Sequence, residues 1–229
     1  MRSSGFWVTH VLARLKSLYG AAIQRSAEYN LPWVAALLIL PSLSKMKAGA
    51  GANRRTIVVL PKDGFTQDIM GALSDDPAIA VVGFPRMVLR RLSRAFLPYF
   101  MDNNNYISCG PEFDAAKLEY RRFLKALFGA LRRFMRIDAV MSGNFAYAPD
   151  RELASAMSEM GIPFIVLHKE NLKTPGRLKF FERVYRDRRG PFTGRKILVY
   201  NETERDLQIR AGVAAPPAVE HFELVVKSE

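Results

Sequence analysis

The sequence has 229 residues, of which 49% are hydrophobic and 24% charged, which excludes a largely disordered chain. This length suits one α/β domain with a substantial core, alone or with a helical extension. The net charge of +12 favours anionic partners. No nucleic-acid-binding signature accompanies this charge, and its absence disfavours nucleic acid as the partner. The single cysteine, Cys109, excludes an internal disulfide, and no spacing of ligands suits a metal ion.

The first 47 residues predict an N-terminal amphipathic helical extension. Residues 6–29 have helical periodicity, and the apolar run 31–43, interrupted by two prolines, is too short to span a bilayer. Its late start and the lack of a small-residue cleavage site disfavour a signal peptide. A basic amphipathic helix followed by a short apolar stretch is typical of proteins that lie on an anionic membrane surface. The alternative is a helix packed on the domain or on a partner.

Residues 48–54, mostly Ala and Gly, predict a linker to an α/β domain over 55–229. Short runs rich in β-branched residues are typical of strands buried on both faces of a parallel sheet. They predict strands over 56–60, 78–82, 137–141, 163–167, 196–200 and 219–226. Helices are expected over 66–74, 86–97, 114–136, 151–160, 175–188 and 203–211, with Thr66 and Asp150 as caps. The alternation predicts a Rossmann-like three-layer domain with a mostly parallel sheet of five or six strands.

Polar residues follow three of these strands at their carboxyl ends, where ligands bind in parallel sheets. Residues 62–64 suit an anion near the next helix N-terminus, or form a plain turn. Residues 142–144 suit a hydroxyl-rich ligand or a capping turn, and residues 201–202 suit a ligand contact or a helix cap. The residues expected to bind substrate here are Lys62, Asp63, Gly64, Ser142, Gly143, Asn144, Asn201 and Glu202.

A fourth strand end carries His168, Lys169 and Glu170, which offer a base, a cation and an acid after an apolar strand. His168 and Glu170 are the candidate catalytic pair, because histidine is a general base near neutral pH and a neighbouring carboxylate raises its basicity. Lys169 is a candidate substrate contact. The alternative is a hydrogen-bonded strand terminus without a role in chemistry.

Several familiar motifs are missing. The first strand is not followed by G-x-G-x-x-G, and no Walker A sequence occurs, which disfavours NAD binding and P-loop chemistry. No G-x-S-x-G occurs, so serine hydrolase chemistry is not supported. We therefore expect no bound cofactor and no metal.

Over residues 55–213 the chain resembles the N-terminal lobe of GT-B glycosyltransferases, in particular those of bacterial surface and capsular polysaccharide synthesis. The likeness is carried by 138–144 (DAVMSGN), 160–170 (MGIPFIVLHKE), 197–207 (ILVYNETERDL) and 211–213 (AGV). It implies a sugar or lipid-linked acceptor, and a cytoplasmic location peripheral to the inner face of the membrane. It also implies a nucleotide-sugar donor held by a second lobe, which we expect this chain to lack and to obtain from a partner or a homo-oligomer.

Two other functions stay open. The chain is alternatively a non-catalytic binding or scaffold protein with a basic surface. It is also compatible with a nucleotide-binding enzyme that has an atypical phosphate loop around residues 62–66.

Overall fold

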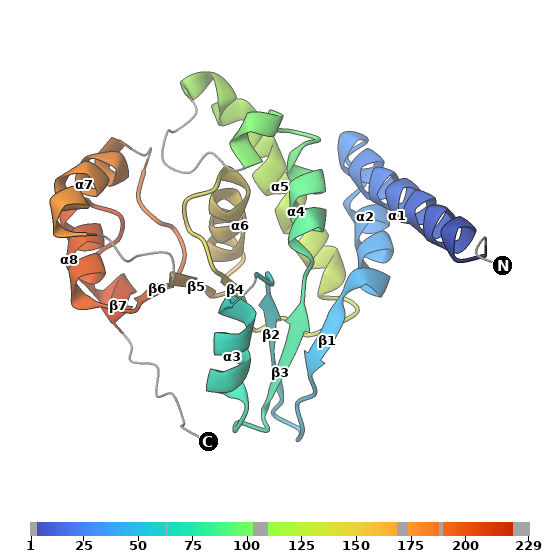
Figure 1. Cartoon of the computed structure of the whole chain (residues 1–229), viewed down its shortest axis with the longest axis horizontal. Coiled ribbons are helices and arrows are strands. Elements are labelled where there is room, and N and C mark those ends of the chain that lie inside the picture. The colour runs from blue at the N-terminus through green and yellow to red at the C-terminus, as the bar shows by residue number, and fades with distance from the viewer. Residues whose placement is uncertain (1–3, 63, 103–109, 169–173, 188–189, 222–229) are drawn as a thin grey trace.

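The computed structural model describes residues 4–62, 64–102, 110–168, 174–187 and 190–221 (Figure 1). Its strands form one sheet in the order β1-β3-β2-β4-β5-β6-β7. The strands are β1 (Ser44–Lys47), β2 (Arg55–Val59), β3 (Ile79–Gly83), β4 (Ala139–Ser142), β5 (Phe164–His168), β6 (Lys196–Val199) and β7 (Val219–His221). The α-helices are α1 (Ser4–Glu28), α2 (Pro32–Ile39), α3 (Phe65–Leu73), α4 (Arg86–Ser93), α5 (Asp114–Leu131), α6 (Ala148–Glu159), α7 (Leu178–Asp187) and α8 (Glu202–Arg210). Short 3₁₀ turns cover Leu40–Ser42, Tyr99–Asp102, Pro111–Phe113, Pro175–Arg177 and Pro216–Ala218.

The direction in which the chain builds the sheet reverses at β2. The chain passes from β2 to β3 on one side, and then returns to place β4 on the other side of β2, with all three strands parallel. Right-handed crossovers then require α3 on one face of the sheet and the later helices on the opposite face. Figure 1 shows α3 on one side and α4, α5 and α6 on the other. This confirms the predicted mostly parallel α/β sheet.

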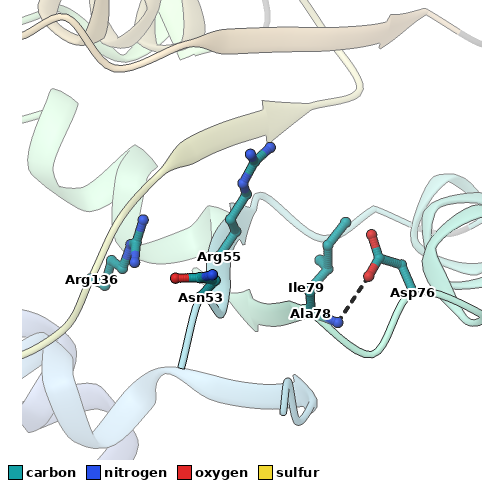
Figure 2. Close-up of a pocket in the computed structure, with 6 residues that line it drawn as sticks. All are labelled: Asn53, Arg55, Asp76, Ala78, Ile79 and Arg136. Carbon is teal, nitrogen blue, oxygen red and sulfur yellow. Dashed lines mark hydrogen bonds between the residues drawn. The ribbon is translucent and has the colours of Figure 1, made fainter. Parts of the chain in front are cut away.

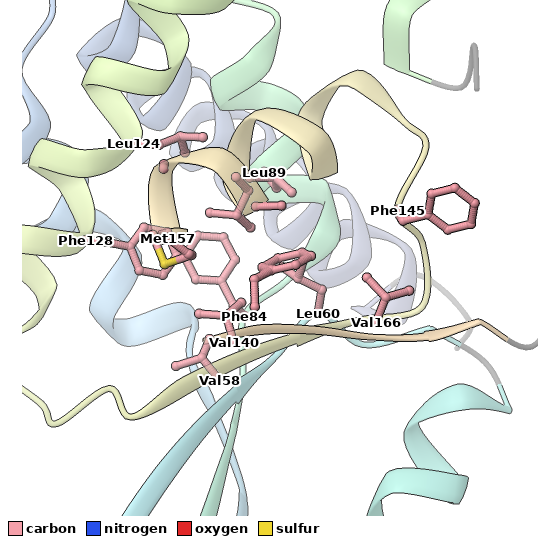
Figure 3. Close-up of a cluster of buried hydrophobic side chains, with 14 of the residues drawn as sticks. Val58, Leu60, Phe84, Leu89, Leu124, Phe128, Val140, Phe145, Met157 and Val166 are labelled. Atoms are coloured by element: carbon pink, nitrogen blue, oxygen red, sulfur yellow. The ribbon is translucent and has the colours of Figure 1, made fainter. Parts of the chain in front are cut away.

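The main core lies between the sheet and α4, α5 and α6 (Figure 3). Because successive strand residues point to opposite faces, Val58 and Leu60 enter this core while Val59 faces Phe65 and Ile69 of α3. Phe84, just after β3, stacks on Phe128 of α5 with ring centroids 5.8 Å apart. The main core therefore holds α4, α5 and α6 on the sheet. The N-terminal turns of these helices border the carboxyl ends of the strands.

The sheet has seven strands rather than the expected five or six. The additional strand β1 lies within the expected helical extension and pairs antiparallel with β3, as in Ser44 opposite Gly83. Its sequence, Ser-Lys-Met-Lys, is polar because it is an edge strand, so it lacks the apolar signal of the central strands. The segment 1–47 is thus not a purely helical extension.

The helical part of that segment packs on the domain. Ile23 and Ala27 of α1 and Ala35, Ala36 and Ile39 of α2 belong to the main core. Among the described residues, no helix combines the length and the apolar character needed to cross a bilayer.

Candidate functional site

The reversal at β2 brings three strand ends together. Leu60 N donates to Met141 O over 2.9 Å, which joins the loop after β2 to β4. Phe84 N donates to Val59 O over 2.7 Å, which joins the loop after β3 to β2. In open parallel sheets, ligands bind outside the carboxyl ends of the strands where the strand order reverses. Residues 60–62, 64, 84–86 and 142–147 border that point here.

Asp150 is the centre of the polar contacts at this point. Its side chain is buried, and Ser142 Oγ donates to its Oδ1 over 2.6 Å. Arg86 Nη2 donates to its Oδ2 over 3.2 Å. Asp150 was expected to cap a helix from 151, but α6 begins at Ala148 with Tyr147 at the N-cap position. Asp150 is therefore in the first turn, where the helix dipole favours a carboxylate, and its side chain binds Ser142 and Arg86 instead of capping.

Several charged groups of the described residues act on one another here. Burial raises the pKa of Asp150, and the charges of Arg86, Arg90 and Lys62 and the Ser142 hydrogen bond oppose that rise. Burial lowers the pKa of Lys62, the charge of Arg86 lowers it further, and Asp150 opposes both. The charges of Lys62, Arg86 and Arg90 thus all act on the one carboxylate of Asp150.

Arg86 is held so that only part of its guanidinium is used. Its side chain is 15% exposed and lies against the Tyr147 ring, 5.9 Å from the centroid. Nη2 binds Asp150, whereas the buried Nη1 finds no acceptor among the described residues. We call Lys62, Arg86, Ser142 and Asp150 the switch-point cluster.

The turn after β2 is closed by its own side chains. Thr66 Oγ1 accepts from Lys62 N over 3.1 Å and donates to Lys62 O over 3.0 Å, so Thr66 closes this turn and does not cap α3. Gly64 occupies the N-cap position with φ of +72°, a conformation that favours glycine. Gly64 thus has a backbone role, and among the described residues of this turn Lys62 brings charge to the cluster.

The turn after β4 is also mostly structural. Asn144 is buried, and its Oδ1 accepts from Ala146 N over 2.7 Å and from Tyr147 N over 2.9 Å. A Cβ atom on Gly143 would lie 3.4 Å from the ring of Phe65, an ordinary van der Waals contact, so the packing of α3 does not by itself require glycine there. Ser142 alone of this turn points to the charged groups.

His168 belongs to a separate buried cluster. His168 points to the same face of β5 as Phe164 and Val166, because every second residue of a strand faces the same way. Its imidazole therefore lies on the main-core face and is 1% exposed. Its Nε2 lies 3.7 Å from Glu204 Oε1 of α8, and its ring meets Phe145 edge-on with centroids 4.7 Å apart. In this conformation a substrate does not reach the imidazole.

Glu204 is the acceptor that organises this second cluster. Its Oε1 accepts from Tyr185 Oη over 2.9 Å and from Gln208 Nε2 over 2.8 Å. All of these side chains are buried. The cluster ties α7 and α8 to β5.

Of the remaining expected site residues, the described Asn201 and Glu202 do not join the switch-point cluster. Asn201 Oδ1 accepts from Glu204 N over 2.7 Å, so Asn201 caps α8, as the alternative interpretation held. Glu202 is exposed, 3.7 Å from Arg205. Asp63, Lys169, Glu170 and Cys109 lie outside the described residues.

Sequence reasoning missed Arg86 and the partners of Asp150 and His168. Arg86 follows β3 after Gly83-Phe84-Pro85, so the rule that selects polar residues at strand ends would have found it. Glu204 carries no such signal, since it contacts His168 only through the packing of α8.

A different hollow lies at the opposite, amino-terminal edge of the strands (Figure 2). It measures about 520 Å³ and is lined by Asn53, Arg55, Asp76, Ala78, Ile79 and Arg136. Arg136 Nε binds Asp138 Oδ1 over 2.6 Å, and Asp76 Oδ1 accepts from Ala78 N over 2.8 Å. These groups stabilise local turns. Across the described ranges, no three His, Cys, Asp or Glu side chains gather as metal ligands.

Comparison of the chain with known protein families, with curated proteins and with solved structures finds no match.

Proposed function

We propose that this chain is the acceptor-side lobe of a GT-B-like glycosyltransferase of bacterial envelope or capsular polysaccharide synthesis. The observation that carries the proposal is the convergence of Lys62 and Arg86 with the buried Ser142–Asp150 pair at the reversal point of a parallel sheet. In this proposal the nucleotide-sugar donor is bound by a second lobe, and the protein works at the cytoplasmic face of the inner membrane.

The roles of the cluster follow from its contacts. Asp150 orients the guanidinium through Nη2, and Ser142 orients Asp150, so both are positioning residues. Lys62 and the Nη1 side of Arg86 supply the charge for the anionic group of the acceptor, such as the phosphate of a lipid-linked sugar. His168 has no role in transfer in this proposal, because it is buried against Glu204.

The test is a transfer assay in membranes of cells that carry the full-length gene product. Label from a panel of tritiated UDP-hexoses is followed into the lipid-extractable fraction. Lys62→Ala should raise the KM for endogenous acceptor at least tenfold and leave the KM for the donor unchanged, because one charge-assisted contact contributes about 1.5–3 kcal/mol. Lys179→Ala, an exposed lysine on α7, is the matched control.

Two outcomes would replace this proposal. Tight binding of ATP or GTP by this chain alone, lost in Lys62→Ala, would make it a nucleotide-binding enzyme; the Lys62–Thr66 turn is the feature in favour. Unchanged lipid labelling after deletion of the gene would leave a binding or scaffold protein.

A further inference from the structure

Exposed apolar side chains concentrate on the first two helices. Thirteen large hydrophobic side chains are exposed among the described residues, and seven of them lie between residues 15 and 37. Leu18 is 67% exposed, Trp33 51% and Leu37 54%. Single exposed apolar residues are ordinary on protein surfaces, but a gathering of this size is a mark of an interaction site.

The helix α2 is apolar on every side. Its sequence, Pro-Trp-Val-Ala-Ala-Leu-Leu-Ile, has no charged side chain. Its inner face, formed by Ala35, Ala36 and Ile39, is buried, whereas Val34 and Leu37 share the outer face. A helix that is apolar all round is typical of a core or of contact with lipid. The inner face of α2 lies in the core, and its outer face is exposed.

The segment that contains α1 and α2 also carries an excess of basic side chains. Residues 1–47 contain six Lys or Arg and one acidic residue, Glu28, a net charge of 6 − 1 = +5. Arg14, Lys16 and Arg25 are exposed on α1, and Arg25 Nε lies 3.6 Å from Glu28 Oε2. Residues 14–18 are exposed all round the helix, and Figure 1 shows α1 extending past the domain.

A second aromatic joins the face from another element. Phe134, which follows α5, is 51% exposed and meets Trp33 edge-on, with ring centroids 6.3 Å apart. Arg132 and Arg133 beside it are exposed. We call Leu15, Leu18, Trp33, Val34, Leu37 and Phe134 the α1–α2 surface.

We propose that the α1–α2 surface docks on an anionic lipid bilayer, with Trp33, Val34 and Leu37 in the headgroup–acyl boundary. Apolar and aromatic groups beside Lys and Arg match an interface that presents acyl chains below phosphates. A second copy of this chain is disfavoured as the occupant, because it would bring two segments of charge +5 together. The proposal does not rest on the proposed function, since no residue of the switch-point cluster takes part.

The experiment is co-sedimentation of the full chain with vesicles of phosphatidylcholine alone or with about 30% phosphatidylglycerol. We expect binding to the anionic vesicles only. Removing Arg14, Lys16 and Arg25 together, as glutamines, should weaken it roughly a hundredfold, at about 1 kcal/mol for each charge. In a Trp7→Phe background, Trp33 is the only tryptophan, and its emission should shift to the blue on binding.

Leu37→Glu tests the apolar contact, because it places a charge in the lipid boundary at a position that is half exposed in the protein. It should weaken vesicle binding more than tenfold without changing the far-ultraviolet circular dichroism. Phe180→Glu, equally exposed on α7, is the matched control and should bind as wild type. Wild-type binding by Leu37→Glu, or a dimer in sedimentation equilibrium that Leu37→Glu dissociates, would overturn the proposal.

Discussion

The ion pair between Arg86 and Asp150 makes the switch-point cluster sensitive to the loss of one partner. Replacing Arg86 with methionine leaves a carboxylate that is 2% exposed without its nearest cation. Breaking a fully buried pair in this way costs about 3–5 kcal/mol. Here Lys62 and Arg90 still act on Asp150, so we expect Arg86→Met to lower the free energy of unfolding by about 2–3 kcal/mol at pH 7.

Removing the second charge should then restore stability. Arg86→Met/Asp150→Asn no longer buries a carboxylate without its nearest cation, and we expect it to be about 1–2 kcal/mol more stable than Arg86→Met alone. The cost in the single variant should also grow with pH. Burial raises the pKa of Asp150 in the folded state, so between 3.8 and that raised pKa the folded state binds more protons than the unfolded state and stability falls as the pH rises.

Urea unfolding followed by circular dichroism between pH 5 and 8 measures these differences, with equal m-values as the check on two-state behaviour. Arg133→Met, at an exposed position, is the control and should change stability by less than about 0.5 kcal/mol. If the double variant is no more stable than Arg86→Met, the two groups are energetically independent and the reasoning fails.

Three further predictions use the same unfolding assay, with the pH range extended to 10.5 for the first. The lowered pKa of Lys62 means that stability rises as the pH is raised from that pKa towards 10.5, since the unfolded state keeps the proton longer; Lys62→Met should lack this rise. Asn201→Ala should cost about 1 kcal/mol through loss of the cap on Glu204 N and leave ligand binding intact; a selective loss of binding would instead support the substrate role expected from the sequence. Tyr185→Phe should cost about 1–2 kcal/mol because Glu204 loses a buried donor, and a neutral result would show that water takes its place.

The central strands were predictable because they are buried on both faces and therefore consist of continuous runs of apolar residues. The run at 56–60 became β2, one residue earlier at each end, for this reason. The edge strand β1 was missed because one side of an edge strand faces solvent and its residues are polar. Helix α2 lies within the expected helical extension, but its own bounds were not predicted because a helix that is apolar all round has no periodicity to detect.

The candidate site was predictable in position but not in its contacts. The strand-end rule selected Lys62 and Ser142, which do border the reversal at β2. It did not show that Arg86 and Asp150, 64 residues apart, would meet there. It also selected His168 as a base, although alternation along its strand places this side chain in the core with Val166.

The most direct test of the switch-point cluster as the anion site is a titration of ¹⁵N-labelled protein with inorganic pyrophosphate. We predict saturable amide shifts confined to residues 60–66, 84–90 and 142–150, and their loss in Lys62→Ala. Shifts confined to the hollow around Arg55 and Arg136, or shifts that survive Lys62→Ala, would contradict this account.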